Sequence, residues 1–216
     1  MRLTKNIVLA STNFDKLVEF RELLKLNNSQ QSIVPVDSIV RNAGVLGKVE
    51  VFATYRENAA AKARLANQAC HYPCLADDSG LEIEALGGKP GARSARFATP
   101  TDKMTQDQAN IDKVLSELKG VPLDKRRAKF VCSLALVIEG VLLESTGTIE
   151  GWIAEAPTGA QGFGYDPIFL PDHADAGRKT FAELGVDFKN RHSHRAVAFS
   201  KLMESLRSHG IVIARV

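Results

Sequence analysis

The segment Leu75–Leu81 restricts the fold of this chain more than any other stretch. It reads Leu-Ala-Asp-Asp-Ser-Gly-Leu, so an apolar strand runs directly into two adjacent carboxylates, Asp77 and Asp78. We expect a tight turn there, with negative charge at the rim of a buried sheet. Neighbouring carboxylates repel each other unless a cation or a proton offsets them. Mg²⁺ suits this task, since it is usually held by one or two carboxylates plus substrate phosphates. An Asx turn before Gly80 explains the same letters without a metal.

The order of apolar runs and turns predicts an α/β protein. Short apolar runs alternate with amphipathic segments early in the chain, and two long apolar runs follow, separated by a turn at Glu139-Gly140. This combination favours a mixed sheet with helices. No linker interrupts the chain, so residues 1–216 are expected to form a single domain. We expect strands at Asn6–Ala10, Ile33–Val36, Cys74–Ala76, Lys129–Glu139 and Val141–Glu150, and helices at Phe14–Leu26, Thr54–Ala69, Asp107–Leu118 and Ser193–Arg207. The first of these helices is expected to be amphipathic, with Phe14, Leu17 and Leu24 facing inward and Lys16, Glu19, Glu22 and Lys25 largely facing outward.

Charge and cysteine content argue against several classes of protein. The 28 basic and 25 acidic residues leave a net charge of +3, which is too small to indicate a nucleic-acid partner. Three cysteines, an odd number without paired spacing, indicate a reducing compartment. The longest largely apolar run, Val131–Ile138, is far shorter than a membrane span, and the first residues lack the pattern of a signal peptide. We therefore expect a cytoplasmic protein that binds neither membranes nor nucleic acid.

Two segments have features of a phosphate-binding site. The segment Ser11–Lys16 lies at a strand-to-helix junction, where free backbone N–H groups and a partial positive charge favour anions. Lys16 is one turn into that helix and leans toward its start. Asn58 and Lys62 are four residues apart, hence on one helical face, among alanines that permit close packing. A helix capped by Thr12 or Asn13 with an exposed lysine, and an ordinary surface lysine, explain the same two patterns.

Two further segments suit a nucleobase. Gly159–Pro167 places glycines around two aromatic residues and an acid, so a ring can stack there and a carboxylate can accept base N–H groups. Lys189 and the segment Ser193–Arg195 place cationic donors at the start of the last helix. Such donors neutralise phosphate or bind a carbonyl on a ring. A glycine-rich turn with inward aromatics, and a helix capped by Ser193, are the alternative explanations.

In combination these motifs resemble one family. Their order is Ser-Thr-Asn-x-x-Lys, Glu-Asn-Ala-x-x-Lys-Ala, Ala-Asp-Asp-Ser-Gly-Leu, Gly-Gly-x-Pro-Gly-x-x-Ser-Ala-Arg, Gly-Phe-Gly-Tyr-Asp-Pro-Ile-Phe and Ser-His-Arg-Ala. This order is similar to that of the inosine triphosphate pyrophosphatase family, from Val8 to about Leu206. The family hydrolyses ITP, dITP and XTP to the monophosphate and pyrophosphate with Mg²⁺. The resemblance implies an elongated mixed β-sheet flanked by helices, two lobes around a central cleft, and a homodimer.

The resemblance also assigns roles to residues. Asp78 is the implied catalytic carboxylate, which binds Mg²⁺ or orients the attacking water. Lysines and the first helix start would contact phosphates, the Phe163–Asp166 segment would hold the base, and the last helix start would sense the 6-oxo group. The implied substrate contacts are Ser11, Thr12, Asn13, Phe14, Asp15, Lys16, Lys62, Ser79, Phe163, Gly164, Tyr165, Asp166, Lys189, His194 and Arg195.

One departure from the family pattern concerns the metal. The family usually carries Glu-Glu-Thr-Gly-x-Thr-Phe before the Glu-Asn-Ala helix, and the second Glu of that run ligates metal. This chain has Val49-Glu50-Val51-Phe52-Ala53-Thr54 instead. Glu50 lies seven residues before Glu57, at the expected spacing, so we assign Glu50 as the second metal carboxylate beside Asp78.

Two other functions are compatible with the same motifs. One is a related pyrophosphatase that acts on other modified nucleotides, which the base-binding segment would distinguish. The other is a noncatalytic nucleotide- or RNA-binding module, which would bind without turnover and with a steep dependence on salt. The second alternative leaves Asp77 and Asp78 unexplained, since carboxylates oppose the binding of a polyanion unless a metal intervenes.

Overall fold

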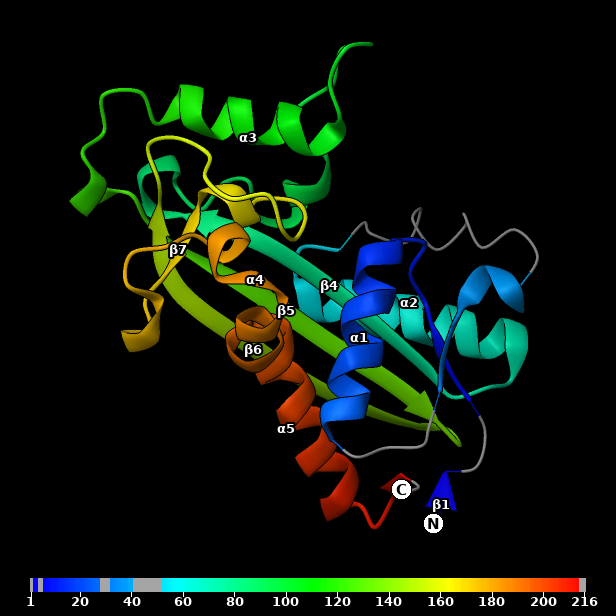
Figure 1. Cartoon of the computed structure of the whole chain (residues 1–216). Helices are drawn as coiled ribbons and strands as arrows, with labels where there is room; N and C mark the ends of the chain where they lie inside the picture. Colours follow the sequence, from blue (N-terminus) through cyan, green and yellow to red (C-terminus); the bar gives the residue numbers. More distant parts are fainter. Residues whose placement is uncertain (1, 4–5, 28–31, 41–51, 214–216) are drawn as a thin grey trace. The chain divides into compact units, whose positions relative to one another are not determined.

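The computed structural model describes residues 2–3, 6–27, 32–40 and 52–213, and Figure 1 traces the chain. Within this part, six strands form one sheet in the order β3-β2-β4-β5-β6-β7. Parallel pairs (β2 with β3 and with β4) and an antiparallel pair (β6 with β7) occur together, which confirms the predicted mixed α/β sheet. The strands are β2 (Ile7–Leu9), β3 (Ile33–Pro35), β4 (Cys74–Ile83), β5 (Arg127–Ile138), β6 (Val141–Ile153) and β7 (Phe169–Pro171), with β1 (Arg2–Leu3) and β8 (Val212–Ile213) paired separately.

The helices match the predicted ones, with one addition. Helices α1 (Phe14–Leu26), α2 (Tyr55–Cys70) and α3 (Gln106–Glu117) lie within a residue of the expected bounds. Helix α5 (His194–Ser208) confirms the last predicted helix. Helix α4 (Phe181–His192) was not predicted, because Gly185 interrupts its apolar pattern and adopts φ of 80° inside it. Short 3₁₀ turns complete the description: η1 (Val36–Ser38), η3 (Glu84–Leu86), η4 (Gly91–Arg96), η5 (Leu123–Lys125), η6 (Asp166–Ile168) and η7 (Ala174–Ala176).

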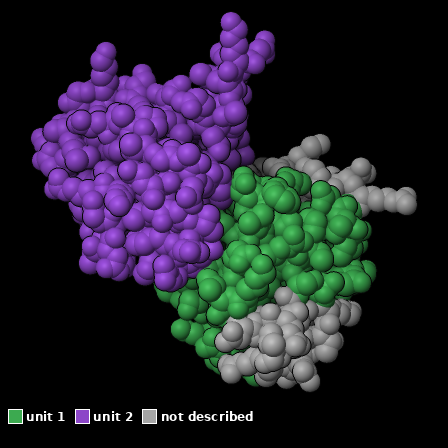
Figure 2. Space-filling model, in the orientation of Figure 1, with its two compact units in different colours: residues 1–78, 132–147, 195–216 green, residues 79–131, 148–194 purple. Residues whose placement is uncertain are grey.

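The chain divides into two compact units, which Figure 2 colours separately. Unit 1 comprises residues 1–78, 132–147 and 195–216, and unit 2 comprises residues 79–131 and 148–194. Strands β4, β5 and β6 contribute residues to both. No helix in the described part of the chain combines the length and the apolar character needed to cross a membrane.

Unit 1 has a core on each face of its sheet. Because successive strand residues point to opposite faces, β2 sends Ile7 and Leu9 to one core and Val8 to the other. The first core includes Leu17 and Phe20 of α1 together with Leu202 of α5. The second core contains small residues of α2, namely Ala59, Ala63 and Ala66. Helices α1 and α5 therefore cover one face of the sheet and α2 covers the other.

Strand β4 continues this alternation and corrects the prediction of an acidic turn. The sequence predicted that the strand would end at Ala76, but β4 runs unbroken to Ile83. Leu75 belongs to the core that the sheet shares with α1 and α5, and Ala76 belongs to the core that it shares with α2. Asp77 therefore belongs to the first face and Asp78 to the second. The two carboxylates are separated by the strand itself, so no turn is needed to hold them.

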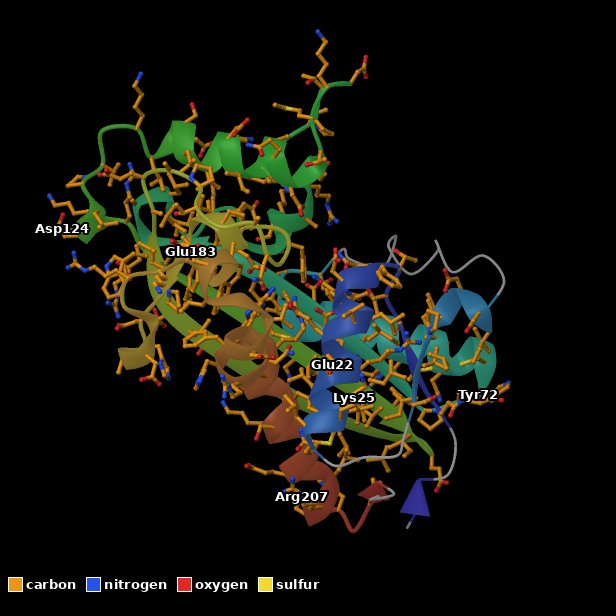
Figure 3. The ribbon with its side chains drawn as sticks, viewed as in Figure 1. Glu22, Lys25, Tyr72, Asp124, Glu183 and Arg207 are labelled. Carbon is orange, nitrogen blue, oxygen red and sulfur yellow. The ribbon has the colours of Figure 1, made fainter. Side chains whose placement is uncertain are left out.

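Helix α1 shows where the amphipathic prediction was right and where it was wrong. Leu17 and Leu24 are buried as expected, and Glu22 and Lys25 form an outward pair, visible in Figure 3, with 2.6 Å between Oε1 and Nζ. Phe14 was expected inside, yet 70% of its surface is exposed. Phe14 is the first residue of the helix, where the chain has just left strand β2.

Unit 2 has its own aromatic core. Phe130 of β5 packs against Phe169 of β7 and Phe181 of α4, with ring centroids 4.5 and 6.2 Å apart. Val114 of α3 and Leu81 of β4 belong to the same cluster. This core anchors the elements on both sides of the glycine-rich segment 159–167.

Candidate functional site

Asp77 is completely buried within unit 1 and lies among cations. The Lys16 Nζ atom is 2.8 Å from Asp77 Oδ2, and the Arg195 Nε atom is 3.7 Å from the same oxygen. Burial by itself raises the pKa of Asp77, but Lys16, Arg195 and Lys62 outweigh it and hold the pKa below its usual range. Asp77 is therefore a permanent anion at neutral pH.

The start of α1 brings Lys16 to this carboxylate. Strand β2 pairs in parallel with β4, and the Ala10 amide donates to the Leu75 carbonyl over 2.7 Å. The chain then turns into α1, where the Asn13 side chain caps the helix by accepting the Lys16 amide over 3.0 Å. The Asn13 cap was one of the two predicted. Thr12, Asn13, Phe14 and Asp15 are exposed around this helix start.

Arg195 is held between two carboxylates. It is the second residue of α5, only 3% of its surface is exposed, and its guanidinium forms an ion pair with Glu19 of α1. Burial alone lowers the pKa of Arg195, whereas Glu19 and Asp77 raise it, and the net effect is upward. Glu19 was expected to face solvent, and sequence reasoning missed its role. The available signal was its position three residues after Lys16, which puts both on one face of α1.

Asp78 is bound by α2 on the opposite face of β4. The Lys62 Nζ atom is 3.0 Å from Asp78 Oδ1, and the Asn58 amide donates to Asp78 Oδ2 over 3.1 Å. Both partners are almost fully buried. The prediction that Asn58 and Lys62 share one helical face is confirmed, and the alanines around Lys62 let α2 approach the sheet closely. Asp78 keeps a small exposed surface, 8% of the residue.

Asn58 also fixes the chain that precedes α2. Its side-chain oxygen accepts the Phe52 amide over 3.0 Å, and its side-chain nitrogen lies 3.4 Å from the Phe52 carbonyl oxygen. One asparagine therefore connects Asp78 with Phe52. Glu50, the predicted second metal carboxylate, lies outside the described residues and is two positions before Phe52.

The charges of unit 1 allow a test of the predicted Mg²⁺ site. A hard divalent cation requires oxygen ligands, and Asp78 supplies a carboxylate that is bonded to Lys62 and Asn58 and retains some exposed surface. Asp77 is fully buried among cations and offers no accessible ligand. Within the described residues no group of three acidic, histidine or cysteine side chains is arranged to hold a metal. Asp78 fits as one ligand, and it needs a second carboxylate and substrate oxygens to complete a site.

In unit 2, Asp166 and Lys189 organise the glycine-rich segment. Lys189 Nζ is 2.5 Å from Asp166 Oδ2, and the Phe163 amide donates to that same oxygen over 2.9 Å. Lys189 Nζ also lies 4.2 Å from the centre of the Phe163 ring. Gly162 adopts φ of 81°, and a Cβ there would approach Asp166 Oδ2 to 2.1 Å, so the segment requires glycine at this position.

Tyr165 and Gly164 attach the same segment to other parts of unit 2. The Tyr165 ring is buried in the aromatic core, its hydroxyl donates to the Ser94 carbonyl over 2.8 Å, and burial raises its pKa. Tyr165 therefore anchors the segment to the aromatic core of unit 2. The Gly164 amide donates to Asp107 of α3 over 2.7 Å. Sequence reasoning missed Ser94 and Asp107 as partners of this segment, since contacts so distant in the chain leave no local signal.

His194 and Ser79 are the remaining predicted substrate contacts. His194 is 3% exposed and stacks on Phe130, with ring centroids 4.7 Å apart and planes inclined by 11°. Ser79 is half-buried in β4, directly after Asp78. Thus unit 1 gathers Lys16, Lys62, Asp77, Asp78 and Arg195, and unit 2 gathers Phe163, Gly164, Tyr165, Asp166 and Lys189.

The α/β sheet therefore carries two acids on opposite faces of one strand, and each acid has its own lysine. The chain belongs to the Ham1 family, whose sequence profile matches residues 7–205. This result confirms the resemblance inferred from the motifs.

Known relatives match this chain over nearly its whole length. The dITP/XTP pyrophosphatase of Bacillus subtilis is 42% identical over 96% of this chain and 100% of the relative, and that of Geobacillus kaustophilus is 44% identical over 93% of each. Among solved structures, the Ham1 protein of Staphylococcus aureus matches with a TM-score of 0.75 and 34% identity, covering 95% of this chain and 100% of that one. The HAM1 protein of Coxiella burnetii matches with a TM-score of 0.76, 37% identity and the same coverage.

Proposed function

We propose that this chain hydrolyses the triphosphates of deaminated purines (ITP, dITP and XTP) to the monophosphate and pyrophosphate, with Mg²⁺. The observation that carries the proposal is the pair Asp77 and Asp78, which stand on opposite faces of β4 with Lys16 and Lys62 against them. Relatives over 40% identical are named dITP/XTP pyrophosphatases, which supports the same substrate class.

The residues of unit 1 supply what cleavage of a phosphoanhydride needs. In this reaction a water oxygen bonds to the α-phosphorus while the bond to the bridging oxygen of pyrophosphate breaks. Positioning and neutralisation of charge dominate such chemistry. Lys16 and backbone amides at the start of α1 bind phosphate oxygens, and Lys62 adds a second cation. Asp78 orients the attacking water or binds the metal, and its bonds to Lys62 and Asn58 fix the direction of its carboxylate.

Asp78 and Glu50 would hold the Mg²⁺ ion. When bound, the ion neutralises phosphate charge and polarises the phosphoryl oxygens. Asn58 supports the role of Asp78, because it donates to one of the Asp78 carboxylate oxygens and also binds the backbone at Phe52.

The segment Phe163–Asp166, Lys189, His194 and Arg195 are proposed to bind the base. Phe163 offers a ring for stacking, and Gly164, Tyr165, Asp166 and Lys189 fix the segment that carries it. His194 and Arg195 would donate to the 6-oxo group, and adenine, with an amino group there, leaves those donors unpaired. Such a mismatch is penalised strongly. Ser79 would contact the substrate next to Asp78.

Four broader proposals accompany this function. The 216 residues act as a single catalytic domain. The active form is a homodimer. The enzyme works in the cytoplasm, where the nucleotide pool is located. Its partner is the nucleoside triphosphate, and neither membranes nor nucleic acids take part.

Product analysis tests the proposal directly. Purified protein is incubated with dITP, XTP, dATP or dGTP, with Mg²⁺ or with excess EDTA, and pyrophosphate and orthophosphate are measured separately. We expect Mg²⁺-dependent release of pyrophosphate from dITP and XTP and little from the other two. Orthophosphate as first product would refute the bond assignment, release from all four would refute the base class, and full activity in EDTA would refute the metal.

A further inference from the structure

Asp107 contacts the proposed base-binding segment from outside every motif described above. It lies in the first turn of α3 and is exposed, and its Oδ2 atom accepts the Gly164 amide over 2.7 Å across 57 residues of sequence. Both residues belong to unit 2. An ionised carboxylate that accepts a backbone N–H makes one of the stronger hydrogen bonds in proteins.

Three consecutive residues of the segment are held by three different elements. The Phe163 amide donates to Asp166, which Lys189 of α4 binds in turn. The Tyr165 hydroxyl donates to the carbonyl of Ser94 in η4. Between them, Gly164 adopts φ of 62° and its amide is directed to Asp107. The contacts of Asp166 with Lys189 and of Tyr165 with Ser94 are buried, whereas that of Gly164 with Asp107 is at the surface.

Helix α3 is a firm support for this contact. The Asn110 side-chain oxygen accepts the Ala98 amide over 2.8 Å, and its nitrogen donates to the Ser94 carbonyl over 3.2 Å. Thr105 caps the helix start by accepting the Gln108 amide. A carboxylate in the first turn of a helix is also favoured by the helix dipole. Asp107 is therefore fixed relative to Ser94, the residue that binds Tyr165.

We propose that Asp107 is a positioning residue that sets base selectivity, because it holds the Gly164 backbone and so the orientation of the neighbouring Phe163 ring. This inference rests on the proposed function of the segment. Asp107 touches no reacting atom and acts through the backbone. Its loss should therefore weaken recognition of the base and leave the chemical step nearly intact.

The expected effect is moderate. A hydrogen bond to a charged group contributes a factor of about 10 to 100, and the exposure of Asp107 reduces this, so Asp107→Ala should raise KM for dITP about 3- to 10-fold. kcat should change less than about 2-fold, and the ratio of kcat/KM for dITP over dATP should fall. Asp107→Asn retains an acceptor oxygen and should recover most of the loss.

Asp112→Ala is the matched control. Asp112 is exposed on the same helix, and its Oδ1 atom accepts a hydrogen bond from Gln108 of that helix over 2.7 Å. We expect this variant to keep the KM and selectivity of the parent protein. Both alanine variants should unfold at nearly the same temperature as the parent.

A measurement without substrate separates this inference from the proposed function. In hydrogen exchange followed by NMR, the Gly164 amide should exchange faster in Asp107→Ala than in the parent or in Asp112→Ala. The role of Asp107 would be overturned if the Gly164 amide exchanged at the same rate in Asp107→Ala and in the parent protein. It would also be overturned if the parent protein were active and Asp107→Ala had the same KM and the same selectivity. Faster Gly164 exchange in a protein that hydrolyses none of the triphosphates would support the contact and reject the function.

Discussion

Replacing Arg195 tests how the buried charges of unit 1 stabilise the fold. The guanidinium lies between Glu19 and Asp77, is 3% exposed, and has its Nε atom 3.7 Å from Asp77 Oδ2. In Arg195→Met, a side chain of similar length fills the space without a charge. Asp77 then keeps Lys16 as its cation, and Glu19 loses its ion-pair partner Arg195.

The expected loss of stability in Arg195→Met follows from the distance between the charges and from their burial. At 3.7 Å and an effective dielectric constant of about 20, the attraction between Arg195 and Asp77 is about 4.5 kcal/mol before desolvation is subtracted. Removing one member of a buried ion pair typically costs about 3–5 kcal/mol. We expect about 3 kcal/mol for Arg195→Met, since Lys16 remains beside Asp77 and the methionine preserves packing. For a chain of this length the melting temperature should fall by about 6–12 °C.

A double-mutant cycle with Glu19→Gln sharpens the test. In the parent protein, Glu19→Gln should destabilise by about 2 kcal/mol, because it removes a charged partner from buried Arg195. In the Arg195→Met background the same change should be neutral or stabilising, because it removes a carboxylate that has lost its cation. Denaturant unfolding of the four proteins gives the coupling energy, for which we expect about 2 kcal/mol.

Additive effects would refute this reasoning. If Glu19→Gln costs the same in both backgrounds to within about 0.5 kcal/mol, the two residues are not energetically coupled. Activity answers a separate question. If Arg195 senses the 6-oxo group, the preference for ITP over ATP should narrow in Arg195→Met. Equal loss on both substrates would instead assign Arg195 to the phosphates or to the carboxylate network.

Two further predictions concern Asp78 and the cysteines. Asp78→Asn should lower turnover by at least about 100-fold. A nonhydrolysable triphosphate should bind to this variant as well as to the parent or more tightly, because a negative charge near the phosphates is removed. Retained pyrophosphate release would contradict the catalytic assignment of Asp78. Burial raises the pKa of the Cys74 thiol, whose Sγ atom is 3.4 Å from that of Cys70, so iodoacetamide at pH 8 should spare Cys74 in the folded protein. Mass spectrometry should find Cys74 modified only after denaturation, and equal labelling in both conditions would show that the thiol is accessible.

Local patterns predicted the secondary structure well because they depend on neighbours in the chain. The bounds of α1 and α2 follow from their caps, Asn13 and Thr54, and from apolar periodicity. The hairpin of β5 and β6 follows from two apolar runs and the Glu139-Gly140 turn. Helix α4 was missed because Gly185 masks a pattern that is stabilised by packing in the aromatic core.

The partners of the site residues were harder to predict, because they join distant segments. Asn58 and Lys62 could be paired from their helical spacing, but nothing local indicates that they bind Asp78, which is 20 and 16 positions away. The contact of Asp107 with Gly164 spans 57 residues and that of Arg195 with Glu19 spans 176. Such pairs are set by sheet order and by which helix covers which face, and these become evident only in three dimensions.

Asp77 and Asp78 have different surroundings, which the predicted turn concealed. A turn would have set Asp77 and Asp78 side by side, so that their mutual repulsion would have required a shared metal. In a strand they point to opposite faces, and each face brings its own cations: Lys16 and Arg195 for Asp77, and Lys62 for Asp78. Asp77 is fully buried and cannot touch a substrate, so its charge orders the cations around it. Asp78 keeps an exposed edge, and of the two it is the carboxylate that can take part in the reaction.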